Sequence, residues 1–252
     1  MALLYFVAAS FGLVIGSFLN VCIYRIPLDR SIVSPPSACP GCGSPIRPWQ
    51  NIPVISYIFL GGRCASCGIR ISPRYPAIEL LNSLLYVAAL YHFGPDVKAL
   101  VVMALLSTFI VITFIDLDHQ IIPDGISIPG IFAGLVLGPL VLGTGLVNSV
   151  LGALAGGGLF YVIALLSKGG MGGGDIKLIT MLGAFLGLQQ VLLTIFVGSV
   201  LGALVGGGLM LLNRAHRKTP IPFGPFLVAG ATVALFYGEE ILGWYGGVNP
   251  WL

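Results

Sequence analysis

The sequence contains very little charge. Only 8% of its 252 residues are Asp, Glu, Lys or Arg, whereas an ordinary soluble domain holds about 25%. Hydrophobic residues make up 57% of the chain, and the mean hydropathy is +1.01. This composition excludes a typical water-soluble globular domain and indicates a protein whose helices lie in a lipid bilayer.

Two further features are missing. The first apolar run, residues 2–24, is not preceded by the basic segment that opens a secretory signal peptide, so we interpret it as a retained membrane span. The chain also lacks a glycine fingerprint placed between a strand and a helix, the pattern of nucleotide-binding folds. The binding site of any nucleotide-like ligand therefore cannot be located from such a motif.

Long apolar runs recur along the whole chain. A membrane-spanning helix needs about 17–25 such residues. We predict an all-α polytopic membrane protein with about eight transmembrane helices. The break near 188–190 is weak, so the sixth and seventh runs could instead form one bent hairpin or one broken helix. The predicted spans are 2–24, 77–93, 98–115, 126–142, 147–167, 176–188, 190–212 and 224–242.

The few basic residues predict the orientation of these spans. Lys and Arg accumulate in short cytoplasmic loops, and an outside N-terminus places eleven of the twelve on that side, all but Lys98. Lys177 is expected to anchor to lipid headgroups, and Arg214, Arg217 and Lys218 to attract anionic lipid. We therefore expect membrane lipid, and no nucleic acid, as their partner. The predicted parts are a first span (1–24), a cytoplasmic loop domain (25–76) and a helical bundle (77–252).

Cysteine is scarce, but four of the five cysteines form two C-x-x-C pairs. Cys39 and Cys42 are separated by 21 residues from Cys64 and Cys67, close to the spacing of four-cysteine zinc sites. Disulfides are rare in the reducing cytoplasm, so we predict zinc, with redox or unliganded thiols as the alternative. Four sulfur ligands leave no open coordination position, which favours a structural role for the metal.

Acidic residues gather at two places that face the same side of the membrane. Asp116, Asp118 and Asp124 follow the third span, and Asp175 ends the glycine-rich segment 169–174. Ionisable groups at membrane spans are candidates for functional sites, and two carboxyls that share a proton can activate a water molecule. The alternatives are helix capping, favoured for Asp124 and possible for Asp175, a solvated loop charge for Asp118, and cation transport.

Several motifs, in order along the chain, resemble the type IV prepilin peptidase family of bacteria. The segment 172–175 also fits the G-x-G-D signature shared with presenilin-like intramembrane aspartyl proteases. Each motif alone is modest evidence, but together they cover nearly the whole chain. The matching segments are 16–21, 24–27, 37–42, 46–49, 51–53, 61–67, 74–79, 115–120 with 123–124, 172–175 and 220–225.

The resemblance implies which residues are catalytic. The family pattern places its first catalytic aspartate seven residues before a proline, here Pro123, which selects Asp116 rather than Asp118. The second catalytic aspartate falls on Asp175. Supporting roles are expected for the neighbouring residues, because acidic groups would attract a basic leader and glycines would let a substrate backbone come close. These supporting residues are Asp118, Asp124, Gly172 and Gly174.

The resemblance also implies two reactions in the bacterial inner membrane. The first removes a short basic leader from type IV prepilins or pseudopilins, just after a glycine and on the cytoplasmic face. The second methylates the new N-terminus with S-adenosylmethionine, an activity associated with loop 25–76. Candidates for holding the methyl donor are Gly61, Gly62, Arg63 and Glu79. The rival hypotheses are a cation-coupled transporter that uses paired carboxylates and a zinc-bearing membrane scaffold.

Overall fold

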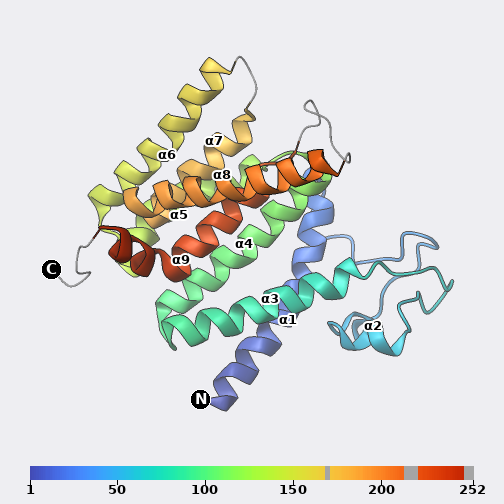
Figure 1. Ribbon diagram of the computed structural model, residues 1–252. Coiled ribbons are helices and arrows are strands. Elements are labelled where there is room, and N and C mark those ends of the chain that lie inside the picture. The colour runs from blue at the N-terminus through green and yellow to red at the C-terminus, as the bar shows by residue number, and fades with distance from the viewer. Residues whose placement is uncertain (168–170, 213–220, 247–252) are drawn as a thin grey trace. The chain divides into compact units, whose positions relative to one another are not determined.

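The computed structural model describes residues 1–167, 171–212 and 221–246, which form helices joined by loops (Figure 1). The basic residues Lys168, Arg214, Arg217 and Lys218, with Gly169 and Gly170, lie outside this part of the chain. The α-helices are α1 Ala2–Arg25, α2 Ile55–Phe59, α3 Arg74–Phe93, α4 Val97–His119, α5 Asp124–Leu137, α6 Leu146–Leu166, α7 Gly173–Leu186, α8 Leu188–Leu211 and α9 Gly224–Gly246. Shorter helical turns are η1 Ile26–Leu28, η2 Pro48–Asn51 and η3 Gly138–Leu142.

Six helical segments of the described chain are long and apolar enough to cross a membrane, which confirms an all-α multi-pass protein. They are Ala2–Leu28, Val97–His119, Asp124–Leu142, Leu146–Leu166, Leu188–Leu211 and Gly224–Trp244. The two other predicted spans fall on α3 and α7. Helix α3 carries the buried polar residues Glu79 and Asn82, and α7 has 14 residues, fewer than the roughly 20 that cross a bilayer.

The weak break near residue 188 separates two helices. Gly187 stands between α7 and α8 with φ +79°, a left-handed conformation that glycine adopts without steric cost. Its N–H still bonds to the carbonyl of Gly183 and closes the last turn of α7. The sixth and seventh predicted spans are therefore two helices joined at one residue, which fits the alternative of a bent hairpin or a broken helix.

The chain packs as two compact units. The N-terminal unit comprises Met1–Val111 and the C-terminal unit comprises Ile112–Leu252, so the boundary falls inside α4. This division follows packing, whereas the boundaries expected at residues 24 and 76 follow membrane and loop segments and stay a prediction. Each unit is described by itself below.

In the N-terminal unit, α1 packs closely against α3 (Figure 1). Two glycines one turn apart allow this approach, because a Cβ at Gly12 or Gly16 would lie 2.7 Å from the Cα of Ser83 or Glu79. The Asn82 side chain donates to the carbonyl of Gly12 at 2.8 Å. Small residues let helix backbones approach in this way, and buried polar groups then find partners across the interface.

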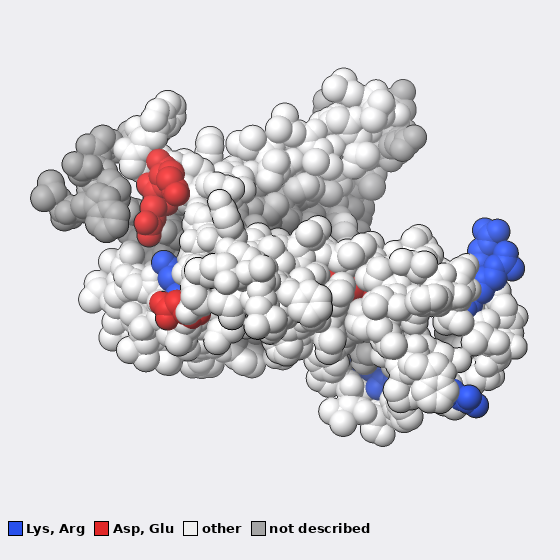
Figure 2. Space-filling view, turned by 90° about the horizontal axis from the view of Figure 1, so that it is seen from below, with Lys and Arg blue, Asp and Glu red and all other residues white. Residues whose placement is uncertain are grey.

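In the C-terminal unit, the short helix α7 forms the centre of the core. It packs against α5 and α6, and its residues Leu178, Ile179 and Leu182 are fully buried. Gly183 of α7 lies directly against Gly152 of α6, with no room for a side chain on either. On the face seen in Figure 2, broad uncharged areas separate isolated blue and red groups.

Candidate active site and metal centre

Asp116 lies in the last turn of α4 and is 5% exposed. Its Oδ2 accepts a hydrogen bond of 2.9 Å from the backbone N–H of Gly224. Gly224 is the first residue of α9, and the first N–H groups of a helix have no partner within the helix. The positive end of the helix dipole also favours a carboxylate there. The start of α9 thus holds the carboxylate of Asp116 in place.

Gly224 is a site residue that the sequence reasoning did not single out. A Cβ at this position would lie 2.6 Å from Oδ2 of Asp116, so any other residue would displace the carboxylate. The available signal was the motif at 220–225, in which a glycine precedes Pro225, since proline is common in the first turn of a helix. That pattern predicts a helix start but not what the helix start contacts.

Asp175 lies in the first turn of α7, outside the six candidate spans. Its backbone N–H bonds to the carbonyl of Gly172 at 3.2 Å. Burial and, next, the charge of Asp116 raise the pKa of Asp175 from 3.8 to about 6. The structure therefore brings the carboxyls of Asp116 and Asp175, the two residues predicted as catalytic, into electrostatic contact within the C-terminal unit.

Ile122 explains why these chain segments meet. It is buried in the loop after α4, and a Cβ at Gly174 would lie 2.9 Å from the Cβ of Ile122. On its other side, the Cδ1 of Ile122 would lie 3.4 Å from a Cβ at Gly224. Gly174 thus permits α7 to begin against the loop that follows Asp116. Gly172 has more room, because its added Cβ would lie 3.4 Å from Oδ2 of Asp175.

Asp124 and Lys177 form an ion pair between the starts of α5 and α7. The Nζ of Lys177 donates to Oδ1 of Asp124 at 2.6 Å, with 39% and 59% of the side chains exposed. The capping prediction for Asp124 is wrong, because Pro123 is the N-cap of α5 and no side chain caps that helix. The expectation that Lys177 anchors to lipid headgroups stays a prediction, because the ion pair leaves 39% of this side chain exposed. Asp118 is exposed in the last turn of α4.

The four predicted metal ligands come together in the N-terminal unit. The sulfur atoms of Cys39, Cys42, Cys64 and Cys67 all lie within 4.8 Å of one another, and the Sγ atoms of Cys39 and Cys67 are 3.8 Å apart. A tetrahedral ion with Zn–S bonds of about 2.3 Å requires sulfur separations of about 3.8 Å. The cluster therefore has the donors and the spacing that a single zinc ion needs.

Two matching turns aim these sulfur atoms. The N–H of Gly43 bonds to the carbonyl of Cys39 at 2.8 Å, and the N–H of Gly68 bonds to that of Cys64 at 2.9 Å. Both glycines have a positive φ, +69° and +73°, which residues with a side chain rarely adopt. Each turn closes one C-x-x-C pair, as its sequence predicts.

The four candidates for holding the methyl donor do not all line the same cavity. Glu79 is 7% exposed and lines a cavity of about 580 Å³ in the N-terminal unit. Gly61, Gly62 and Arg63 do not line it, and both glycines have a positive φ typical of a turn. Gly62 affects the cavity indirectly, because an added Cβ would lie 3.0 Å from the ring of Tyr57, and Tyr57 forms part of the cavity wall.

Comparison with known proteins shows extensive similarity. Residues 10–93 match the family model described as the bacterial peptidase A24 N-terminal domain, and residues 103–207 match that of the type IV leader peptidase family. Curated proteins of Pseudomonas aeruginosa, Aeromonas hydrophila and Bacillus subtilis, each named prepilin leader peptidase/N-methyltransferase, are 38%, 39% and 37% identical to the chain. The alignments cover 91%, 93% and 93% of this chain and 89%, 91% and 95% of those proteins. No solved structure matches the chain significantly.

Proposed function

This chain belongs to the type IV leader peptidase family, and we propose that it removes the leader of type IV prepilins or pseudopilins and then methylates the new N-terminus. Its place would be the bacterial inner membrane, with both reactions on the cytoplasmic face. The multi-pass helical architecture and the named relatives support this proposal. Neither the relatives nor the fold favours the cation-coupled transporter.

The observation that carries the peptidase proposal is the pairing of Asp116 with Asp175. The charge of Asp116 acts on Asp175, and the Gly224 N–H binds Asp116 from the other side. The hydrogen bond favours negative charge on Asp116, and the pKa of about 6 lets Asp175 hold a proton at a higher pH than an ordinary aspartate does. A pair in which one carboxyl is ionised and the other protonated has the groups that general acid–base hydrolysis requires.

The proposed cleavage consumes one water molecule. Ionised Asp116 accepts a proton while the water oxygen bonds to the carbonyl carbon of the glycine before the cut, and Asp175 donates its proton to the carbonyl oxygen. In the second step the C–N bond breaks, the nitrogen takes the proton from Asp116, and the hydroxyl proton returns to Asp175. The products are a leader with a new carboxyl group and a mature protein with a free amine, and both aspartates regain their starting states.

The N-terminal unit supplies the groups for methylation. The cysteine cluster would hold a structural zinc ion, and S-adenosylmethionine would supply the methyl group that the newly released amine accepts. The cysteine sulfurs fit a tetrahedral ion, and the unit contains a cavity with a buried carboxylate. The chain's own residues bind and orient the reactants, and zinc with four sulfur ligands takes no part in the chemistry.

The test is incubation of the purified protein with a prepilin and S-adenosylmethionine, followed by measurement of the product mass. The expected product lacks its leader and carries one added methyl group. Asp116→Asn or Asp175→Asn should lower cleavage by about 100-fold or more, since each removes a proton-transfer group. Cleavage at the wild-type rate by either variant would disprove the catalytic assignment.

A further inference from the structure

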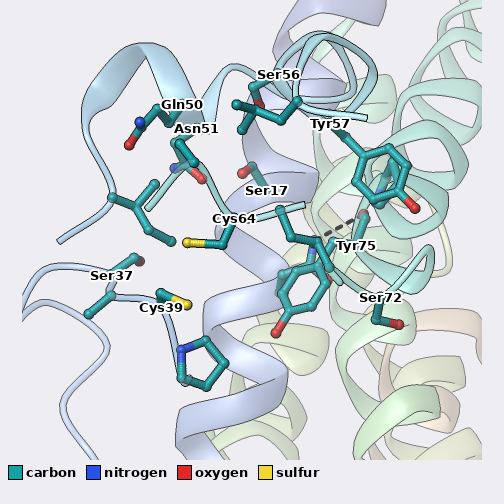
Figure 3. A pocket seen from close by; sticks show the side chains of 18 of the residues that line it. Ser17, Ser37, Cys39, Gln50, Asn51, Ser56, Tyr57, Cys64, Ser72 and Tyr75 are labelled. Carbon is teal, nitrogen blue, oxygen red and sulfur yellow. Dashed lines mark hydrogen bonds between the residues drawn. The ribbon is translucent and has the colours of Figure 1, made fainter. Parts of the chain in front are cut away.

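The N-terminal unit contains a cavity that the peptidase site does not use. Its volume is about 580 Å³, and its walls come from the end of α1, the loop between α1 and α3, and the start of α3. Ligand pockets in proteins measure about 300–1,000 Å³. Figure 3 shows Tyr57 and Tyr75 on one side of this cavity and the sulfur atoms of Cys39 and Cys64 toward the other.

The lining combines aromatic rings with charges of both signs. Tyr24, Tyr57 and Tyr75 contribute the rings, Arg25 and Arg70 the cations, and Glu79 the anion. Aromatic faces bind planar bases and cations, and an arginine binds carboxylates. The chemistry of the wall therefore suits a ligand that carries an aromatic base, a positive charge and a carboxylate in one molecule.

Glu79 is the most distinctive group of this lining. Its Oε2 accepts a hydrogen bond of 2.7 Å from the backbone N–H of Val54, and the Ser17 hydroxyl bonds to the same carboxyl. Within the part of the chain that the structure describes, these two hydrogen-bond donors to Glu79 are both neutral. A buried carboxylate is stabilised more strongly by a cation than by neutral donors alone. The charge of Glu79 is thus positioned to interact with a cationic ligand.

We propose that this cavity binds S-adenosylmethionine and that Glu79 supplies the negative charge that favours its sulfonium. This inference rests on the proposed methyltransferase function and adds the location of the donor. S-adenosylmethionine has an adenine ring, a sulfonium, an ammonium and a carboxylate, which match the tyrosines, Glu79 and Arg70. Glu79 binds and orients the donor, and it makes no bond to the methyl group.

The cysteine cluster and the cavity share residues. Cys39 and Cys64 belong both to the cluster and to the cavity wall. Gly62 lies behind Tyr57, so its missing side chain leaves room for the ring in the wall. The residues of the metal-binding turns therefore shape the cavity, whereas Glu79 of α3 provides its charge.

The experiment uses the purified full-length protein and measures binding directly. Radioactive S-adenosylmethionine is cross-linked to the protein by ultraviolet light, and the labelled peptide is identified by mass spectrometry. The expected label lies within residues 17–25 or 37–79. Dissociation constants for S-adenosylmethionine and for S-adenosylhomocysteine, which lacks the sulfonium charge, are measured by titration calorimetry.

Glu79→Gln keeps an acceptor for the Val54 N–H but removes the charge. It should raise the Kd for S-adenosylmethionine by about tenfold or more and that for S-adenosylhomocysteine by less than about threefold. Asp96→Asn, an exposed carboxylate next to α4, is the matched control and should change neither. Zinc content and melting temperature check the fold. Should Glu79→Gln not fold, Tyr57→Ala, which alters the half-buried wall, should also weaken donor binding by about tenfold.

Three results would overturn the assignment. These are a label confined to residues 112–252, unchanged donor binding in both folded variants, and equal weakening of the two ligands by Glu79→Gln. If the wild-type protein still methylates its product in these cases, the proposed function stands and only the site is wrong. If the wild-type product carries no methyl group, the proposed function itself fails.

Discussion

The two units of this protein each hold one buried acidic residue in place, but by different means. Glu79 accepts from the backbone of Val54, which belongs to the cysteine-containing loop, whereas Asp116 accepts from Gly224 at the start of a long helix. A glycine makes room beside each, Gly16 for Glu79 and Gly224 for Asp116. The position of Glu79 thus depends on an ordered loop, whereas that of Asp116 depends on helix packing. Different substitutions should therefore displace the two carboxylates.

Loss of the metal should give the largest effect, because it should impair donor binding in the N-terminal unit far more than leader cleavage in the C-terminal unit. Cys39→Ser combined with Cys64→Ser removes two ligands, and zinc should fall from about one ion per chain to nearly none, measured by mass spectrometry of the metal. The loop should then lose its order, and binding of S-adenosylmethionine should weaken by more than about tenfold. Leader cleavage should fall less, because Asp116 is held by α9.

Cys22→Ser is the control, since Cys22 is buried in α1 and outside the cluster. It should leave the zinc content unchanged. Unaltered zinc content in the double variant would contradict the metal assignment. Equal loss of cleavage and donor binding would contradict the separate support of the two carboxylates.

A side chain at Gly224 should give the second largest effect, a loss of leader cleavage in the C-terminal unit. Gly224→Ala places a Cβ 2.6 Å from Oδ2 of Asp116, which must then move. Displacement of a catalytic group by about 1 Å can lower a rate about 100-fold, so cleavage should fall by that order in a rate assay. Zinc content and donor binding should remain at wild-type values.

Gly158→Ala is the matched control, because this glycine of α6 has open space where a Cβ would lie. It should cleave the prepilin at nearly the wild-type rate. Equal activity of the Gly224→Ala and Gly158→Ala variants would show that the contact between α9 and Asp116 does not matter for catalysis.

Neutralising Asp175 should change stability in a pH-dependent way. The pKa of Asp175 is raised from 3.8 to about 6, so the folded protein holds this proton more tightly than the unfolded chain. The resulting stabilisation is fully present below about pH 4 and is lost as the pH rises through about 6. Asp175→Asn should therefore melt at a higher temperature than wild type near pH 8, with a smaller difference near pH 4.

Thermal unfolding in detergent at both pH values provides the measurement. Gly158→Ala serves as a control, because it leaves every titratable side chain in place and has open space for its Cβ. A gain in stability for Asp175→Asn that is the same at both pH values would refute the idea that Asp116 and burial hold the proton on Asp175.

The ion pair between Lys177 and Asp124 should give the smallest effect. Both side chains are substantially exposed, and such pairs contribute about 0–1 kcal/mol. Lys177→Gln should shift the melting temperature only slightly, and less at high salt, while cleavage changes by less than about twofold. A loss comparable to that of Gly224→Ala would instead assign the pair a direct part in the reaction.

Much of the site follows from local sequence. The two C-x-x-C-G turns are specified by short-range spacing, because each needs only a glycine with positive φ after its second cysteine. The aspartates were candidates because few acidic residues lie beside the apolar runs, and the resemblance to the peptidase family then selected Asp116 and Asp175. The ion pair between Lys177 and Asp124 was not predicted because its two residues are 53 positions apart in the chain, and no local pattern encodes such a pair.

By itself the sequence determined the all-helical membrane class and predicted the four sulfur ligands, because hydropathy and ligand spacing act over short stretches of chain. The choice of Asp116 and Asp175 among the acidic residues came from the resemblance to the peptidase family. Only the tertiary structure decided that Gly224 holds Asp116, that Ile122 packs between Gly174 and Gly224, and that Glu79 lines a cavity. The reason is steric: whether a glycine is required depends on which atoms of a distant segment occupy the space of its missing side chain.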